Sequence, residues 1–254
     1  MTIHATPIPG TGIVSPETHL VRAQGPFQLR RIRPGISLGQ PDDAGFGGLG
    51  VIDHAKLQPG LVVGMHEHRN DEIISYMRAG QMRHTDSAGH SEVLSSGRLM
   101  VMNAGNGFSH EEEVVGSDRI EMLQIFVRPE AAELNPDVQF VNLTEADRNG
   151  HWRLLTGPVG SSAPTFVRQA VYLYDVRLNA GEAIDLPSMK GFDRWFYVFD
   201  GEATVADEKI AKHVGLMVPA EDNGVTARAT VDSDLVVFLV DRSAKYSREG
   251  TMSD

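Results

Sequence analysis

One spacing of glycines, histidines and an acid occurs twice in this chain, and the second copy lacks the histidines. The first copy follows the frame G-x5-H-x-H-x3-E-x7-G and consists of Gly60, His66, His68, Glu72 and Gly80. In the second half the same frame falls on Gly181, Pro187, Met189, Asp193 and Gly201. Both glycines recur, whereas the two side chains that could bind a metal ion become a proline and a thioether. The repeat therefore predicts two halves of similar fold, with a metal site in the first half alone.

The length of the chain agrees with this duplication. At 254 residues it can form two domains of ordinary size. We expect an N-terminal domain over residues 1–130 that holds the metal site, and a C-terminal domain over residues 131–254 that lacks one. The segment 129–160 is polar and rich in Pro, Asn and Gly, so we expect the boundary there. Residues 1–20 and 243–254 are expected to be loosely held tails or edge segments.

Short apolar stretches separated by turn residues indicate an all-β protein. Glycine is frequent, at 26 residues, and helical periodicity is almost absent. The expected strands are 27–32, 50–57, 72–77, 81–85, 98–102 and 121–127 in the first half, and 171–178, 195–199, 202–205, 215–218, 225–229 and 235–240 in the second. Within 72–77 and 194–199 apolar residues nearly fill the run, as in strands covered on both faces. Two sheets packed face to face in each half fit this pattern.

Composition excludes several classes of function. The chain has no cysteine, so disulfides, thiolate metal sites and cysteine nucleophiles are excluded. The formal charge of -11 repels phosphate backbones, so we expect no direct binding to nucleic acid. No basic start precedes an apolar stretch at the N-terminus, and no run approaches the length of a membrane span. A soluble, cytoplasmic protein with no membrane partner is expected.

The histidine pair is weak evidence by itself. His66 and His68 are two residues apart, so on a strand both imidazoles point to the same face. Ten histidines in 254 residues produce roughly 0.4 such pairs by chance. The pair alone therefore fits two exposed or hydrogen-bonded histidines better than a metal site. Of the other histidines, His54 is expected in the core or at a cavity wall, and the ones expected to be exposed are His84, His90 and His151.

A second pair of residues favours a metal site over two exposed or hydrogen-bonded histidines. A glycine-rich turn leads to His110 and Glu112, which share one strand face by the same alternation. Three imidazoles and one carboxylate would form a borderline-hard site that suits iron and tolerates manganese, cobalt, nickel, copper or zinc. Four protein ligands on a six-coordinate ion would leave two positions open.

The frame, followed by G-x7-G-x4-H-x-E from Gly97 to Glu112, resembles the cupin superfamily and, within it, the pirin family. The hairpin sequence Arg83-His-Thr-Asp-Ser-Ala-Gly89 also resembles pirins. The resemblance implies two tandem cupin barrels of the double-stranded β-helix (jelly-roll) type, the second degenerate and without metal. It implies one divalent transition metal, iron(II) before the others, with the ligands His66, His68, His110 and Glu112. Glu72 would lie outside the ligands, where it could orient a histidine.

Pirin-like proteins include quercetin 2,3-dioxygenases, so the resemblance implies a metal-dependent dioxygenase that uses O2 to cleave a flavonol or a similar small aromatic substrate. Glu112 would be the catalytic base that takes the proton of the flavonol 3-hydroxyl group. The apolar candidates for the substrate-binding wall are Met65, Ile74, Tyr76, Met100, Met102 and Phe108.

Two other interpretations stay open. The resemblance also allows an iron-binding, redox-sensing regulatory protein that binds a protein partner, and a vestigial or structural site is the third interpretation. The stretch from His66 to Asp71 departs from the usual pirin pattern, which has a proline between the histidines. The substrate preference can therefore differ from that of other pirins.

Overall fold

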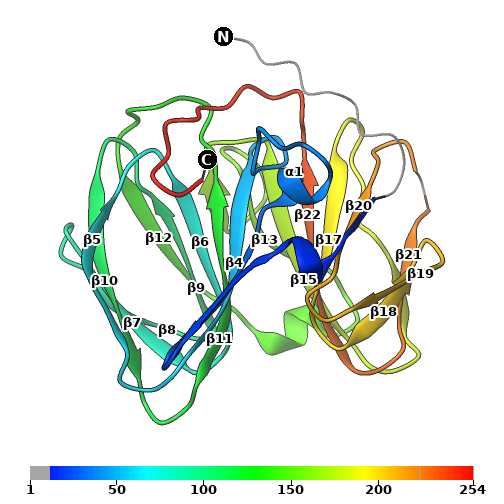
Figure 1. The fold of residues 1–254 in the computed structure, drawn as a ribbon, viewed down its shortest axis with the longest axis horizontal. Helices are drawn as coiled ribbons and strands as arrows, with labels where there is room; N and C mark the ends of the chain where they lie inside the picture. The colour runs from blue at the N-terminus through cyan, green and yellow to red at the C-terminus, as the bar shows by residue number, and fades with distance from the viewer. Residues whose placement is uncertain (1–11, 223, 254) are drawn as a thin grey trace.

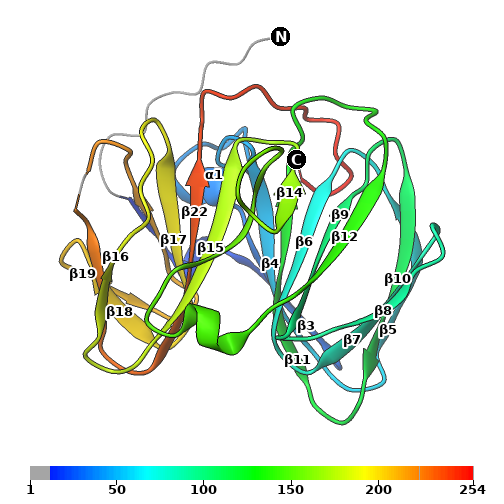
Figure 2. The same cartoon turned by 180° about the vertical axis from the view of Figure 1, so that it is seen from behind.

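The computed structural model describes residues 12–222 and 224–253, which form two β-barrels side by side (Figures 1 and 2). Each barrel consists of a seven-stranded sheet packed on a four-stranded sheet. The two large sheets face each other in the middle of the molecule, and the small sheets lie on its outer sides. The expected all-β fold of two tandem cupin barrels is confirmed.

The first barrel has its large sheet next to the second barrel. In spatial order its strands are β12 (Asp137–Asn142), β9 (Arg98–Asn103), β6 (Glu72–Ala79), β11 (Ile120–Val127), β4 (Leu49–Leu57), β3 (Phe27–Ile32) and β2 (Leu20–Gln24). The small sheet consists of β5 (Val62–His68), β10 (Phe108–Val115), β7 (Gln81–Asp86) and β8 (Ser91–Leu94). Within each sheet of the described structure, neighbouring strands pair antiparallel, except that β13 and β14 of the second barrel are parallel.

The second barrel repeats this plan. Its large sheet has the order β1 (Gly12–Val14), β20 (Gly215–Val218), β17 (Asp193–Asp200), β22 (Ser233–Val240), β15 (Val171–Leu178), β13 (Arg153–Pro158) and β14 (Thr165–Val167). Its small sheet consists of β16 (Ala183–Asp185), β21 (Thr226–Ala229), β18 (Glu202–Val205) and β19 (Glu208–Ala211). The helical segments are short: η1 (Pro16–Thr18), α1 (Pro34–Ser37) and η2 (Glu145–Arg148). Within the described range no helix is long and apolar enough to cross a membrane.

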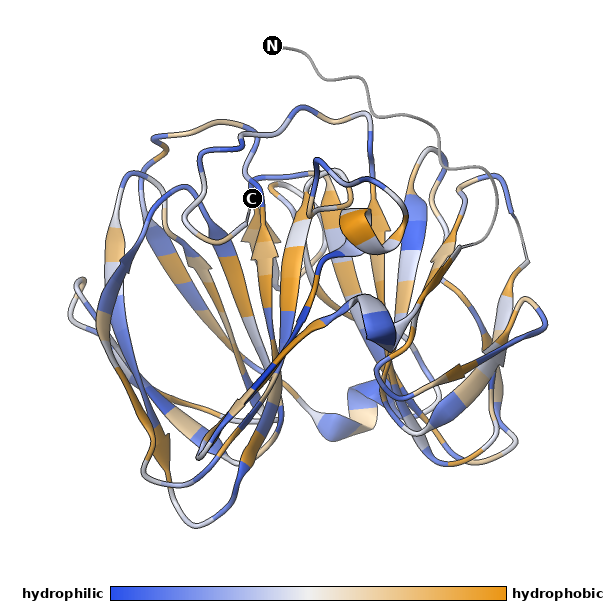
Figure 3. Ribbon diagram, in the orientation of Figure 1, coloured by the Kyte–Doolittle hydropathy of each residue, from blue (hydrophilic) through white to orange (hydrophobic). Residues whose placement is uncertain are grey.

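Three apolar clusters hold the structure together. One fills each barrel, and the third joins the two large sheets, with Ile74 and Leu123 on one side and Trp195 and Phe238 on the other. Figure 3 shows the matching concentration of hydrophobic residues on the central strands. Strands β6 and β17 are therefore buried on both faces, which explains their nearly continuous apolar sequences.

The repeated glycines mark equivalent turns in the two barrels. Gly60 and Gly181 have φ angles of 78° and 87°, and Gly80 and Gly201 have φ angles of 73° and 86°. This left-handed region favours glycine, because it has no Cβ atom. The repeat of the frame therefore reflects a repeated backbone conformation, which explains why the glycines recur although the histidines do not.

The chain does not divide between the barrels at residue 130. Strand β12 follows that position but pairs with β9 of the first barrel, and β1 from the start of the chain pairs with β20 of the second. Both are edge strands, and each pairs on one side with a strand of the barrel that it joins. The expected division into 1–130 and 131–254 therefore differs from the observed exchange of strands at both ends.

The C-terminal tail is firmly held, contrary to the expectation of a loose segment. After β22 it crosses from the second barrel to the first, where the red end of the chain lies in Figure 1. There the Nε atom of Arg128 donates to the carbonyl oxygen of Ser253 at 2.8 Å, and the amide of Thr251 donates to the carbonyl oxygen of Arg69 at 3.0 Å. At the N-terminus, β1 is an edge strand, which agrees with the second alternative expected for this segment, and η1 follows it. Residues 1–11 lie outside the described part of the chain.

Candidate metal centre

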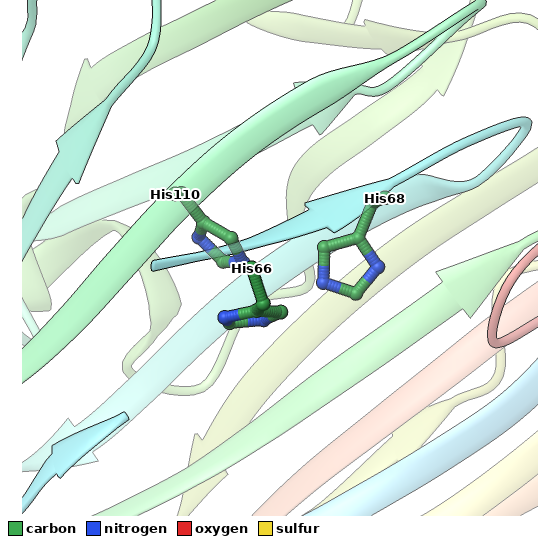
Figure 4. Close-up of side chains that lie close together, drawn as sticks. All are labelled: His66, His68 and His110. Atoms are coloured by element: carbon green, nitrogen blue, oxygen red, sulfur yellow. The ribbon is translucent and has the colours of Figure 1, made fainter. Parts of the chain in front are cut away.

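Three histidines converge at the small sheet of the first barrel (Figure 4). His66 and His68 lie on β5, and His110 lies on the adjacent β10 directly opposite His66. One nitrogen atom of each ring lies within 4.8 Å of the corresponding atoms of the other two. The ring centroids are 4.5 to 5.1 Å apart. Alternation along β5 and the register with β10 thus bring together three of the four side chains expected at the site.

Hydrogen bonds on the far side of each ring leave the other nitrogen atom available. The Nδ1 atom of His66 lies 2.8 Å from the carbonyl oxygen of Gly64, and the Nδ1 atom of His68 lies 3.3 Å from Oδ2 of Asp71. Because these oxygens only accept, both Nδ1 atoms donate, and the lone pair of each ring is at Nε2. The Nε2 atom of His110 is buried without a hydrogen-bond partner. This donor set fits a transition metal ion, which imidazole nitrogens bind in their neutral form.

Burial keeps His110 in that neutral form. Burial, followed by the nearby His68, His66 and His84, lowers the pKa of His110 to about 2. The ring therefore carries no charge near neutral pH. A protonated imidazole could not act as a ligand, so this shift favours metal binding.

Glu112 lies near His110 but outside the group of three histidines. Burial alternates along β10, so Glu112 and His110 share the buried face, as the sequence predicts. The pairing of β10 with β5 shifts register between these two residues. The Oε1 atom of Glu112 accepts a hydrogen bond from Nε2 of Gln124 at 3.0 Å and lies 4.0 Å from Nδ1 of His110. Burial raises the pKa of this carboxyl group to about 7.

The expected role of Glu72 as the partner of a histidine is wrong. Its carboxylate is fully buried and pairs with Arg168 of the second barrel at 2.7 Å, and it also accepts a hydrogen bond from Asn103. The acid that contacts a histidine is its neighbour Asp71, through His68. Adjacent side chains point in opposite directions, so the residue before the strand faces β5 and the first residue of β6 faces the other barrel.

Of the other histidines, His84 was expected to be exposed but is buried, and His54 is buried as expected. His84 is completely buried rather than exposed, and its Nδ1 atom lies 3.3 Å from Nδ1 of His110. His54 is buried in the contact between the barrels, where Nδ1 lies 2.8 Å from the hydroxyl group of Tyr197. His90 and His151 are exposed, as expected. The signal for His84 was present in the sequence, because His84 and Asp86 have the same alternate spacing as His66 and His68.

The expected wall residues divide into three groups. Met100, Met102 and Phe108 pack inside the first barrel. Ile74 and Tyr76 instead belong to the cluster between the barrels, because the interior positions of β6 are Ile73 and Met77. Met65 is 55% exposed on the outer surface, since it alternates with His66 on β5.

The second barrel offers different side chains at the equivalent positions. Pro187 and Met189 follow the end of β16, and the side chain of Met189 is exposed. Within residues 12–222 and 224–253, the three histidines of the first barrel are the one group of at least three His, Asp or Glu side chains with this convergent geometry.

Comparison with known proteins links both barrels to named families. A family model described as pirin matches residues 40–127, and one described as the quercetinase C-terminal cupin domain matches residues 154–240. The quercetin 2,3-dioxygenase of Escherichia coli K12 is 26% identical to this chain over 199 residues, which are 78% of this chain and 84% of the relative. A putative quercetin 2,3-dioxygenase of Mycobacterium bovis is 30% identical over 150 residues, which are 58% of this chain and 62% of the relative.

Solved structures share the two-barrel fold. The crystal structure of the bacterial pirin YhhW from Escherichia coli in complex with nickel(II) has a TM-score of 0.79 at 22% identity, covering 91% of this chain and 98% of the other. A quercetin 2,3-dioxygenase from Acinetobacter baumannii has a TM-score of 0.75 at 20% identity, covering 92% and 86%. At these identities the likeness establishes the fold.

Proposed function

The chain belongs to the pirin family, and on that premise we propose that it is a dioxygenase that cleaves a flavonol or a related small aromatic compound with O2. One divalent transition metal ion would be held by His66, His68 and His110. The observation that carries this proposal is the convergence of three imidazole rings around the buried, unpartnered Nε2 atom of His110. The names of the relatives from Escherichia coli and Mycobacterium bovis support the choice of substrate class.

Iron(II) is the metal we propose first. Three neutral imidazoles accept several divalent ions, and the nickel complex of a structural relative agrees with this tolerance. A divalent metal with open positions supplies Lewis acidity and, in the case of iron, one-electron chemistry toward O2. Apolar side chains inside the barrel, among them Met100, Met102 and Phe108, would favour an aromatic substrate.

Glu112 is the residue to which we assign proton transfer. Its carboxylate lies 4.0 Å from Nδ1 of His110 and is held by Gln124. A pKa of about 7 suits a general base that takes the proton of a substrate hydroxyl group near neutral pH. We also propose Glu112 as a fourth metal ligand. Coordination would require its carboxylate to turn from Gln124 toward the three histidines.

Elemental analysis of the purified protein tests the metal site. The expected result is about one transition metal ion per chain in the wild type and almost none in His68→Ala. His151→Ala removes an exposed histidine of the second half and should retain the metal. Equal metal content in all three proteins would refute the assignment of the ligands.

Oxygen uptake by the iron-loaded protein with quercetin tests the reaction. Uptake that requires both iron and the flavonol, and that is strongly reduced in Glu112→Gln, is the expected result. Protein that holds iron but consumes no O2 with any flavonol or catechol-like compound would refute the dioxygenase and favour the regulatory alternative.

A further inference from the structure

The hairpin sequence from Arg83 to Gly89 places two buried side chains behind the metal centre. His84 and Asp86 lie on β7, which pairs with β10, and Asp86 is directly opposite His110. Both side chains are completely inaccessible to solvent. The Nε2 atom of His84 lies 3.0 Å from Oδ2 of Asp86, and its Nδ1 atom lies 3.3 Å from Nδ1 of His110. A continuous chain of hydrogen bonds therefore runs from a carboxylate to a candidate metal ligand.

The direction of this chain follows from the chemistry of its ends. The carboxylate of Asp86 only accepts, so the hydrogen atom of neutral His84 is on Nε2 and the lone pair is on Nδ1. That lone pair then accepts from Nδ1 of His110, which must carry the hydrogen atom of its own ring. The remaining lone pair of His110 is at Nε2, the atom that has no protein partner.

The carboxylate itself is held in place by the turn of the hairpin. Its Oδ1 atom accepts hydrogen bonds from the backbone amides of Ala88 at 2.9 Å and His90 at 3.0 Å. The Oδ2 atom is left for His84. The exposed ring of His90 also approaches both oxygens but does not contact His110. The turn thus determines which carboxylate oxygen faces the buried histidine.

We propose that His84 and Asp86 are positioning residues for His110, which fix the tautomer that presents its Nε2 lone pair to the metal. The inference rests on the proposed metal site but not on the dioxygenase reaction. Such hydrogen-bonded groups behind a ligand set the ring orientation and raise the basicity of the coordinating nitrogen. Their loss typically weakens metal binding roughly 10- to 100-fold.

The substitution Asp86→Asn tests this proposal, because asparagine has the same shape as aspartate but reverses the direction of the hydrogen bonds from residue 86 through His84 to His110. The two backbone amides require an oxygen atom at the Oδ1 position, so the amide NH2 group of the asparagine must face His84. His84 would then accept at Nε2 and donate from Nδ1. His110 would have to accept at Nδ1 and carry its hydrogen atom on Nε2, where it blocks coordination.

Two measurements detect this change of tautomer at His110. In ¹⁵N-labelled, metal-free protein, NMR of the His110 ring should show an unprotonated Nε2 in the wild type and a protonated Nε2 in Asp86→Asn. A competition titration with Ni²⁺ alone should show roughly 10- to 100-fold weaker binding in the variant. His90→Ala, which removes a ring that contacts Asp86 without altering the chain, should bind Ni²⁺ within about twofold of the wild type.

A packing role for His84 makes a different prediction. His84→Phe fills the site beside Phe140 but removes both nitrogen atoms, whereas His84→Gln keeps a donor and an acceptor. We expect weaker Ni²⁺ binding in the phenylalanine variant and partial recovery in the glutamine variant. Wild-type affinity in His84→Phe, or an unchanged His110 tautomer in Asp86→Asn, would overturn the proposal. A wild-type protein that binds no metal would instead refute the proposed function, and the NMR result would still decide the tautomer.

Discussion

Thr251 donates a hydrogen bond to Asp71, although 180 positions of the chain separate the two residues. The backbone amides of Met252 and Ser253 donate to the same carboxylate at 3.1 and 3.0 Å. Asp71 in turn accepts from Nδ1 of His68. The tail that follows the second barrel therefore completes the surroundings of an acid that orients a candidate metal ligand in the first barrel.

Disruption of this contact should weaken metal binding. Thr251→Val keeps the shape of the side chain but removes the hydroxyl group, and deletion of residues 251–254 also removes the backbone donors. We expect the Ni²⁺ dissociation constant to rise in both proteins, by roughly tenfold in the deletion, because Asp71 loses the donors that fix it. Glu249→Ala, an exposed change in the same tail, is the control. Equal affinities in all four proteins would contradict the coupling.

A second contact between the barrels should dominate the stability of their interface. Asp175 of the second barrel is fully buried, accepts a hydrogen bond from the hydroxyl group of Tyr76 at 2.9 Å, and pairs with Arg148 and Arg153 at 2.9 and 2.8 Å. Asp175→Ala leaves two buried guanidinium groups without this partner. We expect a loss of about 3–5 kcal/mol in the free energy of unfolding, measured by denaturant titration.

Tyr76→Phe is the matched control for this prediction. It removes one hydrogen bond to a carboxylate and keeps both ion pairs, so the expected loss is about 1.5–3 kcal/mol. If both substitutions cost the same, the ion pairs contribute little and the prediction for Asp175 is wrong.

Several strands could be predicted from sequence, whereas the edge strand β12 could not. Strands 27–32, 171–178, 202–205 and 215–218 agree with the structure at both ends, since each is an apolar or alternating run between turn residues. Strand β12 was interpreted as part of a polar linker, because the segment 129–160 is polar and rich in Pro, Asn and Gly. None of the six residues of β12 is buried. Its place depends on pairing with β9, which is a long-range contact that local composition does not encode.

The same division applies to the metal centre. His66, His68 and His110 could be proposed because side-chain alternation is a local property of a strand. The alternate spacing of His84 and Asp86 was also visible in the sequence, but the contact of His84 with His110 was not, since it depends on the register of β7 and β10. The contact of Thr251 with Asp71 depends on the path of a tail across two barrels. The acid expected to orient a histidine was Glu72, but Asp71 makes that contact and Glu72 pairs with Arg168.

The repeated glycines allow a test of backbone strain against crowding. Gly181 and Gly201 have nearly equal φ angles of 87° and 86°. A Cβ atom at Gly181 would meet nothing within 4 Å, whereas one at Gly201 would lie 2.5 Å from the carbonyl oxygen of Asp232. Gly181→Ala should therefore cost about 1–2 kcal/mol for the left-handed backbone. Gly201→Ala should cost about 1–3 kcal/mol more, and equal melting temperatures of the two variants would refute this difference.

A cluster of titratable groups crosses the interface between the barrels. The hydroxyl group of Tyr197 lies 2.8 Å from Nδ1 of His54 and 3.2 Å from Nδ1 of His213. On its other side the ring of His54 contacts Glu121 at 3.0 Å, and Lys212 lies 2.9 Å from the same carboxylate. Burial opposes ionisation of Glu121, but the hydrogen bonds from His54 and Lys212 and the charges of these two residues together outweigh burial and hold the pKa of Glu121 well below its usual range.

Acid should destabilise the protein through this cluster. Burial, followed by the charges of His54, Arg30, Lys212 and Lys56, lowers the pKa of His213 to about 3 from its ordinary value of 6.5. Between these values the unfolded chain binds more protons than the folded one, so stability falls as the pH decreases through this window. The depressed pKa of Glu121 acts in the same direction, because its stabilising charge is lost as the pH falls. Melting temperatures of metal-free protein between pH 7.5 and 4 should therefore decrease less in His213→Asn than in the wild type. Asparagine tolerates the φ of 72° at this position. The remaining titrating groups are common to both proteins. Parallel plots of melting temperature against pH would therefore show that His213 does not contribute.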